Sequence, residues 1–161
     1  MIITPTFVIL LILVFVLVWL FTNTIDKRKW LTFLISIVLT PIAYFYVLYP
    51  VINIFSSYHH EKYFKTEAWK ETPRLRFEML NNIMDDSLLI GKTKPEVKAI
   101  LGASEWYGWD DTMKANSPEK WNYNLGFKPG AFNNMQECIE LEFNNNTVKT
   151  VRQYQLEKTF E

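Results

Sequence analysis

Residues 7–21 read Phe-Val-Ile-Leu-Leu-Ile-Leu-Val-Phe-Val-Leu-Val-Trp-Leu-Phe, an apolar run without a charged, hydroxyl or amide side chain. A helix extended over it from Thr4 to Thr22, with Pro5 at a favourable first position, would be about 30 Å long, the thickness of a bilayer core. A second charge-free run covers residues 30–54, and Pro41 within it predicts a kink. We therefore expect a hairpin of two transmembrane helices, over residues 1–22 and 30–54.

Charge divides the rest of the chain sharply from this hairpin. The 161 residues have a formal net charge of zero, but 14 of the 17 basic and 16 of the 17 acidic residues follow residue 54. The later part carries a small negative charge, and its lysines are interspersed with acids. Because nucleic-acid binding needs a basic surface, this composition argues against that class of function.

The loop over residues 23–29 sets the expected orientation. Lys27, Arg28 and Lys29 lie against both helix ends, and no charged side chain precedes the first helix. The positive-inside tendency then makes the loop cytoplasmic and both termini extracytoplasmic, in a two-pass membrane protein. The opposing signal is a set of lysines after the second helix, diluted by glutamates: Lys62, Lys65 and Lys70.

A cleaved signal peptide is the alternative interpretation of the first helix. No basic segment precedes the helix and no small-x-small cleavage site follows it, so we expect it to be retained. Neither helix contains an ionisable residue, which argues against transport by this chain alone. Ser36, Thr40 and Ala43 could pack closely against the first helix or against a second copy, so a homo-oligomer through the transmembrane helices stays open.

The connector over residues 55–72 is amphipathic and could continue as a helix or lie along the headgroups. Within it, His59, His60 and Glu61 are the alternative metal site. Adjacent residues on a helix point about 100° apart, however, and the His-Glu-x-x-His spacing is absent. We expect a polar interfacial cluster there, with no cofactor. Cys138 is the single cysteine, so no intrachain disulfide can form.

Residues 73–161 are expected to form a small domain that begins with two helices. Thr72 and Pro73 start the first helix, which should run to about Asp86. The second begins where Thr93 and Glu96 form a capping box, and it ends at Gly102.

Three β patterns follow, over residues 121–127, 138–143 and 147–154, and the asparagines at 144–146 suit a tight turn between the last two. The predicted fold class is α+β, an ααβββ domain with an antiparallel three-stranded sheet.

The stretch Leu89–Gly102, followed by Trp121-Asn122-Tyr123, then Leu141-Glu142-Phe143 and Val148, resembles the SmpA/OmlA (BamE-like) domain. The resemblance covers about residues 74–156 and leaves the membrane hairpin outside. It implies an extracytoplasmic, non-enzymatic interaction domain, in the best-known members a lipoprotein accessory of outer-membrane protein assembly. This chain lacks a lipid-attachment cysteine, and Ala103-Ser104 stands where a proline commonly follows the Leu-Gly pair.

The strongest candidate for a binding site is the segment Ser104–Asp111, predicted to lie outside regular structure. Its aromatic and acidic side chains would form a partner-binding patch: Trp106, Tyr107, Trp109, Asp110 and Asp111. The alternative is that the tryptophans close the end of a small core. No spaced calcium loop follows the aspartates, and no catalytic motif is found, so we expect no enzymatic activity.

Together with the resemblance, these observations predict a membrane-anchored, extracytoplasmic interaction module of the bacterial cell envelope, held in the inner (plasma) membrane by two passes, that contacts the lipid bilayer and an envelope protein. A membrane-bound immunity or inhibitor protein is one alternative. A membrane hydrolase or metalloprotein that uses His59, His60 and Glu61 is the other.

Overall fold

The computed structural model describes residues 1–85 and 87–158, and the chain divides into two compact units. The first unit comprises Met1–His60 and the short segment Pro129–Phe132. The second comprises Glu61–Lys128 and Asn133–Glu161. Asp86, where the sequence places the end of a helix, lies outside the described residues.

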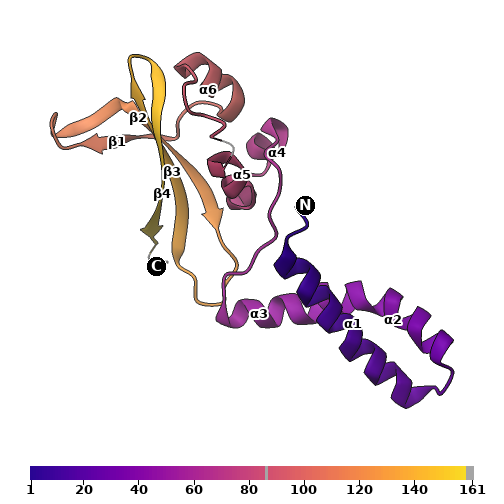
Figure 1. The fold of residues 1–161 in the computed structure, drawn as a ribbon. Coiled ribbons are helices and arrows are strands. Elements are labelled where there is room, and N and C mark those ends of the chain that lie inside the picture. Colours follow the sequence, from indigo (N-terminus) through magenta and orange to yellow (C-terminus); the bar gives the residue numbers. More distant parts are fainter. Residues whose placement is uncertain (86, 159–161) are drawn as a thin grey trace. The chain divides into compact units, whose positions relative to one another are not determined.

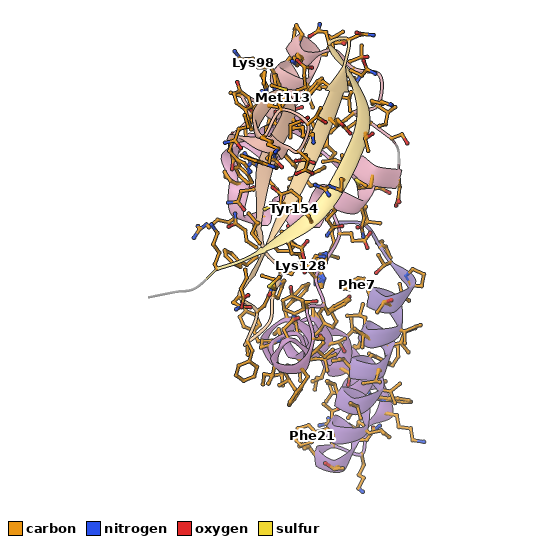
Figure 2. The ribbon with its side chains drawn as sticks, turned by 90° about the vertical axis from the view of Figure 1, so that its left-hand side faces the viewer. Phe7, Phe21, Lys98, Met113, Lys128 and Tyr154 are labelled. Atoms are coloured by element: carbon orange, nitrogen blue, oxygen red, sulfur yellow. The ribbon has the colours of Figure 1, made fainter. Side chains whose placement is uncertain are left out.

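The first unit is built on a helical hairpin. Helix α1 spans Pro5–Ile25, and the return helix consists of α2 (Lys29–Ala43), the π-helical turn η1 (Tyr44–Leu48) and α3 (Tyr49–Phe55). Both Pro5–Ile25 and the continuous stretch Lys29–Phe55 have the length and apolar composition of a membrane span. Figure 2 labels Phe7 and Phe21 towards opposite ends of α1, with apolar side chains between them.

Hydroxyl and amide side chains join the two helices along one seam. The hydroxyl oxygens of Thr22 and Ser36 are 2.9 Å apart, and the Thr32 hydroxyl donates to Asn23 Oδ1 at 2.7 Å. Ser36 and Thr40 also donate to backbone carbonyls one turn earlier. The predicted packing of this polar face against the first helix is therefore present, and its hydroxyls are used within the hairpin.

Two prolines interrupt the backbone hydrogen bonds of the return helix. Pro41 lies inside α2 and Pro50 in the first turn of α3, and neither has an N–H to donate. Between them the helix adopts the wider π-turn, in which the Tyr49 N–H donates to the Tyr44 carbonyl. The helix axis changes direction between α2 and α3 (Figure 1). The predicted bend is thus distributed over η1.

The second unit is an α+β domain. Its helical segments are α4 (Thr66–Glu71), the 3₁₀ helix η2 (Pro73–Met79), α5 (Leu80–Asp85) and α6 (Lys94–Leu101). Its strands are β1 (Trp106–Asp110), β2 (Ala115–Phe127), β3 (Met135–Asn144) and β4 (Thr147–Glu157). They form one antiparallel sheet in the order β1-β2-β3-β4.

The prediction of three strands was therefore wrong, because the segment expected to be irregular forms β1. It pairs with the first half of β2, whose sequence Ala-Asn-Ser-Pro-Glu-Lys has little β character. Pro118 cannot donate to a ladder, and it lies in a bulge where the partner of Tyr107 is Trp121 but that of Gly108 is Ser117. The bulge conceals the strand from a search for alternating side chains.

The core lies between the helices and one face of the sheet, and Figure 1 shows α4, α5 and α6 along that side. Trp69 of α4 is fully buried, and its indole N–H donates to the Leu101 carbonyl at 3.1 Å. Tyr123, Ile139 and Leu141 point towards the helices. The alternate residues of the same strands point away from these helices, so among the described residues of this unit no helix packs on the other face of the sheet.

The start of the domain differs from the single helix predicted from Pro73, since η2 precedes α5. Arg76 of η2 is buried and donates to the Trp69 carbonyl at 2.8 Å, to the Asn124 carbonyl at 2.9 Å and to the Glu105 carboxylate. Its guanidinium also lies 4.8 Å from the Trp69 ring centroid. These contacts join η2 to three other segments of the chain: α4, the residues before β1, and β2.

Two local signals of the sequence are found as predicted at α6. The capping box is present, with the Glu96 carboxylate accepting the Thr93 N–H at 2.8 Å, and Gly102 ends the helix at a φ of 90°.

In β2, Gly126 allows a close approach of two backbones. A Cβ there would lie 2.1 Å from the Arg74 carbonyl oxygen.

Candidate partner-binding surface

The β1–β2 hairpin presents large side chains to solvent. Tyr107, Trp109 and Met113 have exposed fractions of 47%, 57% and 61%. Trp106 is half-buried and pairs with Asn122 across the ladder. Trp109 therefore belongs to the surface, because more than half of its area faces solvent. Met113 is labelled in Figure 2, at the turn between the two strands.

The two aspartates of this hairpin have different roles. Asp110 accepts the backbone N–H groups of Met113 and Thr112, at 3.0 and 2.9 Å, and these bonds hold the pKa of its carboxyl below the ordinary value. Asp110 therefore closes the turn. Asp111 accepts the indole N–H of Trp109 at 3.1 Å, which orients the exposed ring.

Beside Trp109 the open face of the sheet is hollowed. The hollow has a volume of about 290 Å³ and is lined by residues from all four strands and the β1–β2 turn: Trp109, Asp111, Lys120, Glu140, Glu142, Thr150 and Arg152. That volume is roughly ten water molecules. The hollow is large enough for one long side chain of another protein.

The charges around the hollow do not balance. Arg152 is paired with Glu140 at 2.9 Å, and the Lys120 ammonium lies 3.6 Å from Asp110 and 3.1 Å from the Trp109 carbonyl oxygen. Asp111 and Glu142 form no ion pair with any residue in the described ranges. Two carboxylates are thus left to a ligand or to water.

Strand register brings these residues together. Asn122, Glu140 and Arg152 occupy one row across β2, β3 and β4, and the next row holds Lys120, Glu142 and Thr150. Gly108 of β1 makes room for them, because a Cβ there would lie 2.3 Å from Glu140 Oε2. A glycine is therefore required at position 108 for the Glu140 carboxylate to lie at the edge of the hollow.

Five of the seven lining residues were not predicted as part of a site: Lys120, Glu140, Glu142, Thr150 and Arg152. The rows that bring them together depend on pairing between strands. The imperfect alternation of β4 and the bulge in β2 obscured that register.

A second polar cluster lies on the sheet away from the hollow. Glu137 is buried and accepts hydrogen bonds from Gln155 and Gln153, at 2.7 and 2.6 Å, beside the Lys128 ammonium at 3.2 Å. Burial alone would raise the pKa of Glu137, but these partners outweigh it and hold the pKa below its ordinary value. Next to it, burial raises the pKa of the Cys138 thiol to about 11, so the thiol stays protonated at neutral pH.

The residues of the alternative metal site have separate partners. His60 is surrounded by five aromatic rings, those of Phe7, Tyr44, Phe45, Tyr49 and Tyr58. His59 Nδ1 lies 3.0 Å from the Ser57 carbonyl oxygen, and the Glu61 carboxylate accepts the Asn81 amide at 3.0 Å. Within residues 1–85 and 87–158, no group of three or more histidine, cysteine or acidic side chains could hold a metal ion.

The basic residues Lys27, Arg28 and Lys29 lie at the connection between α1 and α2. Arg28 forms an ion pair with Asp26 at 2.9 Å and caps no helix with its side chain, whereas Lys29 begins α2. Lys27 lies between the two helices in the turn.

Comparison with protein-family models, with curated proteins and with solved structures finds no match to this chain.

Proposed function

We propose that this protein is a membrane-anchored interaction module of the bacterial cell envelope, whose extracytoplasmic domain holds another envelope protein on the open face of its sheet. The hollow beside Trp109 carries this proposal. It combines an exposed aromatic ring with two carboxylates that have no ion-pair partner in the described ranges, on a face without a covering helix. Aromatic rings in such settings provide much of the energy of protein interfaces.

Anchoring is supported by the helical hairpin. Its spans are apolar on the outside, while the hydroxyls of Thr22 and Ser36 face each other between the helices. That distribution suits a lipid environment, where the hydrogen bonds of polar groups must be formed within the protein. The basic turn at Lys27–Lys29 supports a cytoplasmic loop and an extracytoplasmic domain.

The partner's chemistry follows from the charges. A lysine or arginine side chain entering the hollow would meet Asp111 and Glu142 and could lie against the Trp109 ring. Both cations that line the hollow already contact acceptors of this domain. An incoming acidic group would therefore have to displace an existing contact, so we infer a basic segment of the partner as the occupant.

The resemblance to the SmpA/OmlA (BamE-like) domain supports the same class of function. In this proposal the family resemblance accounts for an extracytoplasmic domain that binds proteins and performs no chemistry. It does not assign a role in outer-membrane assembly, because folds are shared by proteins of different functions.

The test is a photo-crosslinkable residue at position 109 in intact cells, with the same residue at Lys98 as the matched control. Lys98 is exposed on α6, away from the hollow. We expect a discrete protein adduct from position 109 and none from position 98. Glu142→Lys should reduce the adduct, since it replaces an attractive carboxylate with a like charge for a basic partner.

The domain must stay folded in each variant, which near-ultraviolet circular dichroism reports. If folded protein gives no adduct at position 109, or if Glu142→Lys leaves the adduct unchanged, the proposed site or its partner chemistry is wrong. A toxin-protection assay distinguishes the immunity-protein alternative. Protection that survives loss of the adduct would favour that function.

A further inference from the structure

The segment between β2 and β3 belongs to the unit that contains the apolar hairpin. Residues Pro129–Phe132 group with Met1–His60, although the strands on either side belong to the second unit. A backbone hydrogen bond fixes this segment in place, because the Ala131 N–H donates to the Asn53 carbonyl at 3.0 Å.

That carbonyl lies in the last turn of the second apolar span. Helix α3 ends at Phe55, and the last four carbonyls of a helix have no partner within it. The Ser56 N–H satisfies the Ile52 carbonyl, and Ala131 satisfies that of Asn53. Near a hydrocarbon phase an unsatisfied carbonyl is costly, so the segment completes the end of the helix.

The same segment exposes a large apolar side chain. Residues 129–132 read Pro-Gly-Ala-Phe, without a charge or a polar side chain, and Phe132 is 89% exposed. Phe55, at the end of α3, is 87% exposed. The unit with the apolar helices therefore has two phenylalanine rings that are almost fully exposed, in addition to the exposed apolar side chains of the helices.

We propose that residues 129–132 form a third membrane-contacting element, in which Phe132 inserts into the boundary between lipid headgroups and acyl chains. The hydrogen bond to Asn53 places the segment at the end of a span, and the end of a span lies at that boundary. Interfacial apolar rings attached to such a position are stabilised by the lipid. The inference rests on the proposed membrane insertion of the hairpin.

The lipid bilayer is the occupant that the position favours. A segment hydrogen-bonded to the last turn of α3 lies at the headgroup boundary, and the charge-free Pro-Gly-Ala-Phe sequence offers a protein partner no polar group beyond the backbone. The alternative, a second copy or another protein that covers Phe132, is separated by the experiment.

The experiment places an environment-sensitive fluorophore at single cysteines of the full chain in phosphatidylcholine–phosphatidylglycerol vesicles. The variants are Phe132→Cys, Leu17→Cys in α1 as the inserted control and Lys98→Cys as the aqueous control, each in a Cys138→Ala background. Nitroxide lipids labelled near the headgroup report the boundary, nitroxide lipids labelled deep in the acyl chain report the centre of the bilayer where position 17 is expected, and iodide quenches fluorophores in water. Circular dichroism verifies that each labelled chain is folded.

We expect position 132 to show a blue-shifted emission, loss of fluorescence with the shallow nitroxide lipid, and protection from iodide. If position 132 behaves like position 98 while position 17 is quenched by lipid, the interfacial segment is wrong and the hairpin insertion stands. Protection from iodide without quenching by lipid shows a protein cover and also overturns it. If position 17 is not quenched by lipid, membrane insertion itself fails, and this inference fails with it.

Discussion

Replacing Arg76 with alanine should destabilise the α+β domain more than any exposed substitution in η2. The change removes donors to the carbonyls of Trp69 and Asn124 and leaves the Glu105 carboxylate without its cation. Breaking a buried pair costs about 3–5 kcal/mol, but the Glu105 side chain is 36% exposed and can be hydrated in part. We therefore expect a loss of about 3 kcal/mol, roughly 12–24 °C in the melting temperature of a domain of this size.

Thermal unfolding of the full chain in detergent, followed by near-ultraviolet circular dichroism, measures this loss. Arg74→Ala is the matched control, since Arg74 is exposed and lies on the same 3₁₀ helix. Arg76→Lys should give an intermediate loss, because an ammonium group cannot reach all three acceptors in the plane of a guanidinium. If Arg76→Ala melts within error of Arg74→Ala, the three contacts do not hold η2 to the sheet.

Three further predictions test other parts of the fold. Gly126→Ala should cost about 2 kcal/mol or more in chemical denaturation because its methyl group would collide with the η2 backbone, whereas Gly91→Ala, also at positive φ but with open space, should cost less. The pKa of Glu137 is lower in the folded state, so the ionised carboxylate stabilises the fold above its ordinary pKa of 4.5, and this stability is lost as the pH falls below that value. Acid should therefore destabilise Glu137→Gln less than the parent chain. Equal acid sensitivity of the two chains would argue against the cluster. A double-mutant cycle of Thr22→Val and Ser36→Ala, measured by unfolding in bicelles, should give a coupling of about 0.6 kcal/mol, and a coupling of zero would mean that the hydroxyl contact is not formed.

The parts of the fold that depend on composition and local spacing were predictable. Charge-free runs mark the two long helices, and Thr93, Glu96 and Gly102 mark the limits of α6, because capping chemistry is decided within a few residues. Strand β1 was not predictable in this way. Its partner contains Pro118 and a bulge, so its pairing is stabilised by tertiary contacts rather than by a local pattern.

Of the residues that line the hollow, only those in the β1 strand and the turn after it were predictable from the sequence. Trp109 and Asp111 stand out in the sequence as aromatic and acidic neighbours, and both line the hollow. Lys120 and Arg152 are ordinary surface residues until the register places them in rows with Glu142 and Glu140. Such a site is a property of strand pairing, and alternation along one strand cannot reveal its neighbours on the next.

Under the proposed membrane insertion, the seam between α1 and the return helix limits what the hairpin can offer to neighbouring proteins. Thr22, Ser36 and Thr40 direct their hydroxyls to partners inside the same chain, so the outer surface of the hairpin offers neighbouring helices hydrocarbon much like that of acyl chains. Recruitment into an assembly by polar adhesion of the anchor would require the seam to open first. In that setting binding selectivity would rest with the α+β domain, because the hydroxyls of Thr22, Ser36 and Thr40 are already used within the hairpin and are not offered to a neighbouring protein.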